Sequence, residues 1–151
     1  MKAESFWLNR LVALAILMVA CALLLACSSG NPGSGALPKA VGAADEAAAM
    51  QTLRTIASAE AQLKATSGAY GGFGALVSGG FLDNRFNGDT PNLRGYRFTL
   101  KATEADFALN ADPQTTEAQA ATGGRHFYLD SFDNAVHVNS AGPASRNDPN
   151  L

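Results

Sequence analysis

Three oxygen-bearing side chains lie close together near the carboxyl end of the chain. Asp130 and Asp133 flank a predicted turn, and Asn134 follows directly. Carboxylate and amide oxygens are the ligands that calcium prefers, so these three residues are candidate calcium ligands. Their spacing differs from that of an EF-hand loop, and Asp or Asn in a turn commonly hydrogen-bonds its own backbone. The pattern therefore favours turn chemistry, with calcium as the alternative and no other cofactor indicated.

The two histidines, His126 and His137, fall in separate predicted strands that can pair with each other. A zinc site needs at least three protein ligands, and the sequence places no third ligand beside them. We therefore expect an exposed pair of histidines without a metal.

Glu60 is a carboxylate within an apolar helical stripe, and a buried carboxylate has to be paired or hydrogen-bonded. One hypothesis is a salt bridge from Glu60 to Arg94 or Arg97. The pattern favours the other hypothesis, in which Glu60 lies at the edge of the stripe and its carboxylate reaches water. The apolar members of the stripe are Ala49, Leu53, Ile56 and Leu63.

The sequence lacks the motifs of the common enzyme classes. It contains no Gly-x-Ser-x-Gly, and its glycines between 68 and 80 form neither Gly-x-Gly-x-x-Gly nor a phosphate loop with its lysine. No cysteine follows Cys27, so a nucleophilic thiol is missing as well. We expect a protein that is not an enzyme.

The amino-terminal segment indicates export. Lys2 and Arg10 precede a charge-free run, residues 11–26, that is about 16 residues long, whereas a transmembrane helix needs ~20 apolar residues. A basic start followed by a short apolar run is typical of a signal peptide. We expect residues 1–26 to be removed.

Leu24-Leu25-Ala26-Cys27 resembles the lipobox of bacterial lipoproteins. In that family the cysteine thiol carries diacylglycerol, the bond before it is cut, and the new amino group is acylated; several acyl chains give stable anchoring. The resemblance implies lipidation of Cys27 and a membrane as partner. Ser28 is similar to the signal for transfer to the outer membrane, facing the periplasm. Cys21 is the competing candidate, and the alternatives are an ordinary cleaved signal or a retained anchor helix.

Charge and length limit which partners the exported chain can bind and how many domains it can form. Without the leader, which contains Lys2, Arg10 and Glu4, nine basic and 12 acidic residues remain, for a net charge of −3. No basic tract for nucleic acid is present, so we expect no nucleic-acid partner. The remaining 125 residues suffice for one small domain.

Composition divides this exported chain into three parts. Residues 27–40, rich in Gly, Ser, Pro and Asn, predict a lipidated cysteine and a flexible tether; residues 41–145 predict the domain, and residues 146–151 an irregular tail. Strong helix formers dominate 41–66, and Gly68 follows as a stop signal. A short helix is expected over 73–78 and a surface loop over 84–93.

Aromatic and β-branched residues then predict four short strands, at 96–101, 107–111, 126–130 and 135–139. Apolar and polar residues alternate in two of them, which indicates one buried and one wet sheet face. Residues 130–134 form the predicted hairpin loop, and residues 113–124 a longer loop. The fold class we expect is α+β, with one long N-terminal helix packed on a four-stranded antiparallel sheet.

The order of these elements resembles the head domain of type IV pilins and of type II secretion pseudopilins. The resemblance covers residues 43–145 and implies a pilin-like head, a calcium loop as in major pseudopilins, and envelope or secretion proteins as partners. Its motifs are residues 53–62 as the second half of the pilin helix, Ser67-Gly68-Ala69-Tyr70 as its exit, 76–83 as the connector, and 95–98 and 125–130 as strands.

The chain departs from that family at its amino end. Pilins keep their apolar segment as the first half of the helix and assemble through it, whereas here Pro32 and Pro38 separate the apolar run from the helix. We therefore expect an envelope lipoprotein with a structural or protein-interaction role. The alternatives are a subunit that polymerises through a retained helix over residues 6–26, and a calcium- or ligand-binding module.

Overall fold

The computed structural model describes residues 36–114 and 123–151, and its longest element is helix α2, Ala36–Ser67. The helix ends where Gly68 takes a φ of 82° and its N–H donates to the Lys64 carbonyl at 2.9 Å, as a left-handed glycine does at helix ends. Residues 36–40, expected in the tether, are helical instead. Proline is compatible with position 38 because the N–H groups in the first turn of a helix have no carbonyl partner within the helix.

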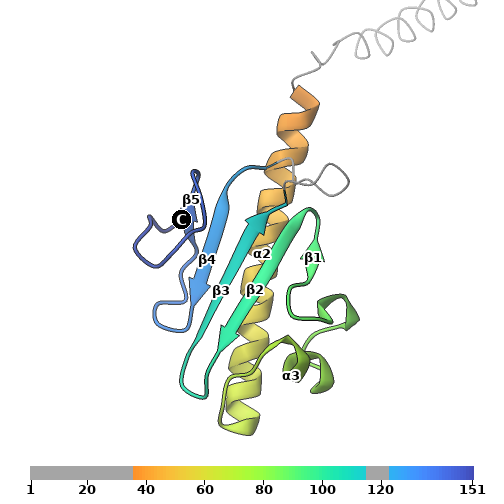
Figure 1. The fold of residues 1–151 in the computed structure, drawn as a ribbon, viewed down its shortest axis with the longest axis vertical. Helices are drawn as coiled ribbons and strands as arrows, with labels where there is room; N and C mark the ends of the chain where they lie inside the picture. Colours follow the sequence, from red (N-terminus) through yellow and green to blue (C-terminus); the bar gives the residue numbers. More distant parts are fainter. Residues whose placement is uncertain (1–35, 115–122) are drawn as a thin grey trace, which may run out of the picture. The chain divides into compact units, whose positions relative to one another are not determined.

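The strands form one antiparallel sheet in the order β1-β2-β3-β4-β5, a simple meander (Figure 1). The α+β class is confirmed, but the sheet has five strands and not four. The strands are β1 Asn92–Leu93, β2 Tyr96–Ala102, β3 Phe107–Pro113, β4 His126–Asp130 and β5 His137–Asn139.

The additional strand, β1, lies at the end of the segment expected to be a surface loop. Arg94 and Gly95 both have positive φ, 49° and 77°, and form the two-residue turn that joins β1 to β2. Such turns match the twist of a hairpin, so Leu93 pairs with Tyr96. A two-residue strand is too short for an alternating pattern to reveal it.

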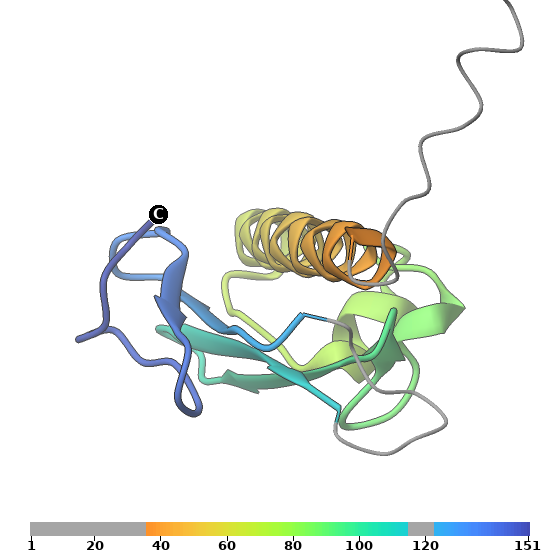
Figure 2. The ribbon, with the colours of Figure 1, turned by 90° about the horizontal axis from the view of Figure 1, so that it is seen from above.

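Helix α2 lies on one side of the sheet, and the apolar core fills the space between them (Figure 2). Leu53 and Ile56, from the predicted stripe, are fully buried against strand residues such as Phe98 and Phe127. Burying each such side chain contributes about 1.5–3 kcal/mol. Helix α3, Phe73–Ser78, forms as predicted, and the 3₁₀ helix η2, Asn84–Phe86, follows it.

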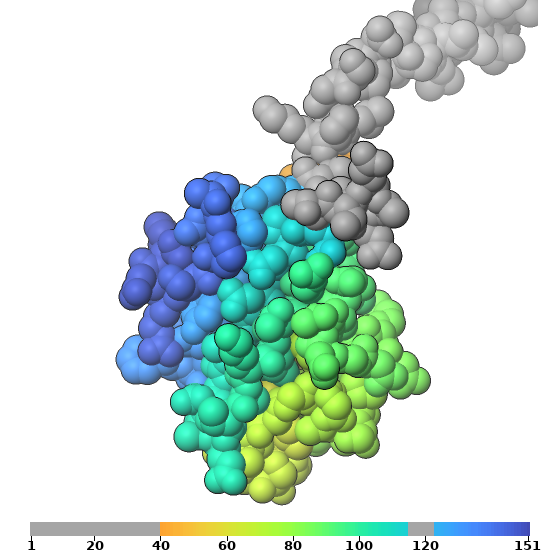
Figure 3. All heavy atoms as spheres, in the orientation of Figure 1, coloured from red at the N-terminus to blue at the C-terminus, as the bar shows by residue number. Residues whose placement is uncertain are grey.

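The C-terminal segment, residues 140–151, is hydrogen-bonded to the sheet although it is mostly irregular. Val138 N–H donates to the Pro149 carbonyl, and Leu151 N–H to the Val136 carbonyl, each at 2.9 Å. These bonds occupy the outer edge of β5, which would otherwise be free to pair with another chain. In Figure 3 the segment is dark blue, beside the strands.

The second face of the sheet is not uniformly wet, contrary to the prediction. Asp130 and His137 point to this face, and both are buried, as is Ala144 of the C-terminal segment.

Among the helices of the described residues, none has both the length and the apolar character that crossing a membrane requires.

Candidate functional site

The predicted lipidation site, Cys27, lies outside the described residues, together with the competing Cys21 and the sorting residue Ser28. Lipidation therefore stays a prediction from the sequence. The other candidate residues all lie in the described part of the chain.

Asp130 ends strand β4, and its carboxylate is fully buried and fully engaged. It accepts hydrogen bonds from the Tyr128 hydroxyl at 2.8 Å and the Phe132 N–H at 2.9 Å, and Arg146 binds it from the C-terminal segment at 2.6 Å. Burial alone raises the pKa of Asp130, but these hydrogen bonds outweigh it and hold the pKa below its ordinary value. The carboxylate is an anchor for Arg146.

Asp133 lies in the β4–β5 loop; its carboxylate binds His137, and its backbone N–H donates to Asp130 Oδ1 at 3.5 Å. Its Oδ2 is 2.9 Å from His137 Nε2, and its Oδ1 accepts the Ala135 N–H at 3.0 Å. His137 Nδ1 lies 2.7 Å from the Asp148 carbonyl oxygen. Both partners of His137 are acceptors, so only the imidazolium, with two N–H groups, satisfies both.

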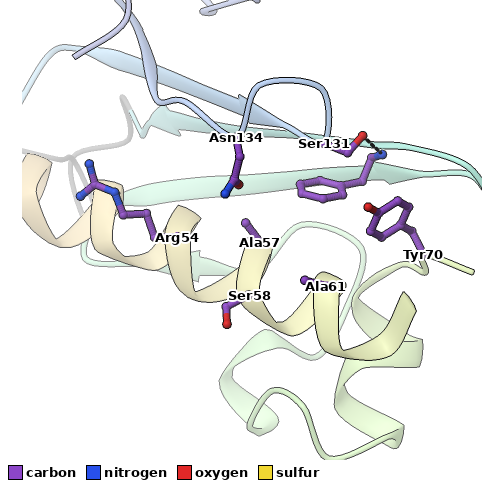
Figure 4. Close-up of a pocket in the computed structure, with 8 residues that line it drawn as sticks. Arg54, Ala57, Ser58, Ala61, Tyr70, Ser131 and Asn134 are labelled. Atoms are coloured by element: carbon purple, nitrogen blue, oxygen red, sulfur yellow. Dashed lines mark hydrogen bonds between the residues drawn. The ribbon is translucent and has the colours of Figure 1, made fainter. Parts of the chain in front are cut away.

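The three candidate calcium ligands, Asp130, Asp133 and Asn134, do not form a coordination site in the described part of the chain. The Asp130 and Asp133 oxygens that would bind the ion are taken by Arg146, His137 and N–H donors. Asn134 has a φ of 54° and its side chain points toward α2 (Figure 4). In residues 36–114 and 123–151, no group of three or more His, Cys, Asp or Glu side chains is placed to hold a metal ion.

The histidines each have a carboxylate partner, and they are not an exposed pair. His126 Nδ1 lies 2.6 Å from Asp112 Oδ1, while His137 opposes Tyr128 across the sheet. The side chain of His137 is only 7% exposed, so its expected exposure was wrong. It is covered because Asp148 of the C-terminal segment packs over it.

Glu60 is fully buried, so neither hypothesis for it was right. Its Oε2 accepts the Gly71 N–H at 3.0 Å, and its Oε1 has no hydrogen-bond partner. The glycine-rich segment after α2 folds back onto the helix and closes off water. Burial raises the pKa of Glu60, and the hydrogen bond from Gly71 only partly offsets this.

A groove of about 620 Å³ runs between α2 and the β4–β5 loop; we call it the helix–loop groove. Its small helix residues leave the space open, and the Tyr70 ring meets Phe107 edge-on at 5.1 Å. Figure 4 shows Arg54 and Tyr70 at opposite ends, with Asn134 extending toward Ala57 between them. The lining residues are Arg54, Ala57, Ser58, Ala61, Tyr70, Phe107, Ser131 and Asn134.

Phe132 lies in the β4–β5 loop and is 77% exposed. The Arg146 guanidinium covers one side of its ring, with 4.7 Å between the guanidinium carbon and the ring centroid. Arg146 is held in turn by Asp130. An exposed aromatic ring is thus presented in a fixed position by two charged residues.

Sequence reasoning missed Arg54, Phe132 and Arg146. Phe132 carried a signal, because a large apolar residue between Asp130 and Asp133 is unusual in a turn. Arg146 carried none, since it lies in a segment without periodicity. Arg54 was noted only as part of the helix.

Comparison with protein-family models, with curated proteins and with solved structures finds no match to this chain.

Proposed function

We propose that this chain is an exported lipoprotein, anchored by acyl chains on Cys27, whose α+β head is a protein-interaction module of the bacterial envelope. The anchor is supported by Leu24-Leu25-Ala26-Cys27 after a short apolar run. The interaction role is supported by one observation above all, the exposed Phe132 ring held by Arg146. Aromatic and Arg side chains dominate the binding energy of protein interfaces.

The geometry of the β4–β5 loop suits this role. Asp130 binds Arg146 through a carboxylate that is 1% exposed, so the guanidinium is fixed before any partner arrives. A fixed side chain loses less entropy on binding. The partner we propose is an envelope or secretion protein with an apolar pocket for Phe132.

The anchor is tested by mass spectrometry of the mature protein and by metabolic labelling with a palmitate analogue. We expect diacylglycerol on Cys27, loss of label in Cys27→Ala, and full label in the control Cys21→Ala. Equal labelling and membrane retention of Cys27→Ala would overturn the anchor.

The interaction surface is tested by a photo-crosslinking amino acid at position 132 in cells, with position 101 on the exposed face of β2 as control. We expect a discrete adduct with one envelope protein from position 132 alone. No adduct, or the same adduct from position 101, would overturn the assignment of this loop.

A second candidate is a subunit that polymerises through a retained apolar helix, as in the pilin resemblance. It is favoured by the start of α2 at Ala36, which shortens the segment between the apolar run and the helix to residues 27–35. The same mass spectrum separates the two: a mature chain beginning near residue 6, without lipid on Cys27, supports the polymerising subunit.

A further inference from the structure

We propose that the helix–loop groove binds a small organic carboxylate that carries an aromatic ring. Phe132 is not among the residues that line the groove, and binding there needs no lipid on Cys27, so the test of this proposal is independent of the proposed function.

The shape of the groove suits such a molecule. Its volume of about 620 Å³ lies within the range of small-molecule pockets. Ala57 and Phe107 are buried beneath it, and the Tyr70 ring closes one end. These groups offer an apolar surface with an aromatic pair, against which a planar ring packs edge-on or offset.

The charge of the groove favours an anion. Arg54 lines it, is exposed, and makes no ion pair with any residue in the described ranges. No acidic side chain is among the lining residues. At the other end, Lys64 Nζ lies 5.1 Å from the centroid of the Tyr70 ring, which adds positive charge there. A guanidinium binds a carboxylate through two parallel hydrogen bonds.

Asn134 adds a second polar group on the side of the groove opposite the helix. Its backbone is fixed by its N–H, which donates to the Asp130 carbonyl at 3.1 Å. Its side chain extends toward the helix and makes no hydrogen bond to any described residue (Figure 4). Its amide can therefore donate to a ligand in the groove.

The test is an amide NMR titration of the full chain in detergent micelles with three probes of similar shape. Phenylacetate is the anion, phenylacetamide the neutral analogue and phenethylamine the cation. We expect phenylacetate to shift the amides of Tyr70, Ser131 and Asn134, with an affinity about fivefold above that of phenylacetamide. Phenethylamine should shift none of them.

Two variants test whether the charge of Arg54 causes the preference for phenylacetate. Arg54→Gln should lower the affinity for phenylacetate to that of phenylacetamide, while Lys101→Gln, which removes the same charge from exposed β2, should leave it unchanged. Equal binding of all three probes, shifts outside the groove, or unchanged affinity in Arg54→Gln would each overturn the proposal.

Discussion

Arg146 and Asp130 are joined through a single oxygen, because Nε and Nη2 of Arg146 both lie 2.6 Å from Oδ2 of Asp130. The pair connects the C-terminal segment to the end of β4. It also fixes the guanidinium that covers Phe132. The same contact therefore holds the segment in place and presents the exposed ring.

Replacing Arg146 by Ala should destabilise the protein. Asp130 is buried, and removal of its cation leaves a buried carboxylate without its charged partner. Because Arg146 itself is half exposed, we expect a lower urea midpoint, with a loss of stability smaller than that from breaking a fully buried pair. Urea unfolding followed by circular dichroism measures it.

The matched control for that variant is Arg85→Ala, which breaks an ion pair of the same type with Asp83. Both partners of this pair are largely exposed, and water screens them. We expect at most a small change in the urea midpoint. An equal loss in the two variants would contradict the role of burial.

Stability should fall as the pH rises above 6.5, because of His137. Hydrogen bonds to the Asp148 carbonyl and to Asp133 raise its pKa above 6.5, so the folded state holds its proton more tightly than the unfolded chain. This contribution is fully present below the unfolded pKa and is lost as the pH passes the folded pKa. Melting temperatures between pH 6 and 9 measure the slope.

The variant His137→Gln tests whether His137 causes this pH dependence. In the variant, the contribution of His137 to the slope of melting temperature against pH should disappear. An NMR titration of the His137 ring should show the raised pKa directly. If the variant keeps the full slope, other groups cause it.

Glu60→Gln should make the protein more stable at neutral pH but not at pH 4. Burial raises the pKa of Glu60, so ionising it costs more in the folded state than in the unfolded chain. Its contribution is greatest below the unfolded pKa and declines as the pH rises through the folded pKa. Gln resembles the protonated acid, and we expect the variant to have a higher free energy of unfolding than the parent protein at pH 7.

The check is urea unfolding of both proteins at pH 4 and pH 7. The difference between them should appear only at the higher pH. A variant that is less stable at both values would show that the Glu60 carboxylate contributes a favourable contact.

Gly123→Ala should destabilise the protein through Glu46. A Cβ at Gly123 would come within 2.8 Å of Glu46 Oε1, so the Glu46 side chain must move away. It would then lose its 2.6 Å ion pair with Arg125. We expect a cost of about 1–2 kcal/mol in thermal unfolding. The neighbouring Gly124→Ala meets nothing within 4 Å and should be neutral.

The helix and most of the sheet could be predicted because their signals are local. The stripe of Leu53 and Ile56 recurs at helical spacing, and the alternation in Tyr96–Ala102 shows which side chains face the core. Strand β1 was missed because two residues have no period. Its turn depends on the positive φ of Arg94, which is uncommon for a residue other than Gly.

The polar clusters could not be predicted in the same way. Asp130 lies 16 residues from Arg146 in the chain, and His137 lies 11 from Asp148. These pairs form because the C-terminal segment returns over the sheet, and no spacing in the sequence encodes that path. The same holds for Glu60, whose burial depends on where the segment containing Gly71 packs.

The sequence by itself determined the α+β class, the long helix and four of the strands, since periodicity and composition act within a few residues. Only the tertiary structure decided which polar side chains meet, because a polar group hydrogen-bonds to a partner that the fold places within about 3 Å. It thereby turned the candidate calcium ligands into anchors for Arg146 and His137, and opened the groove beside Arg54.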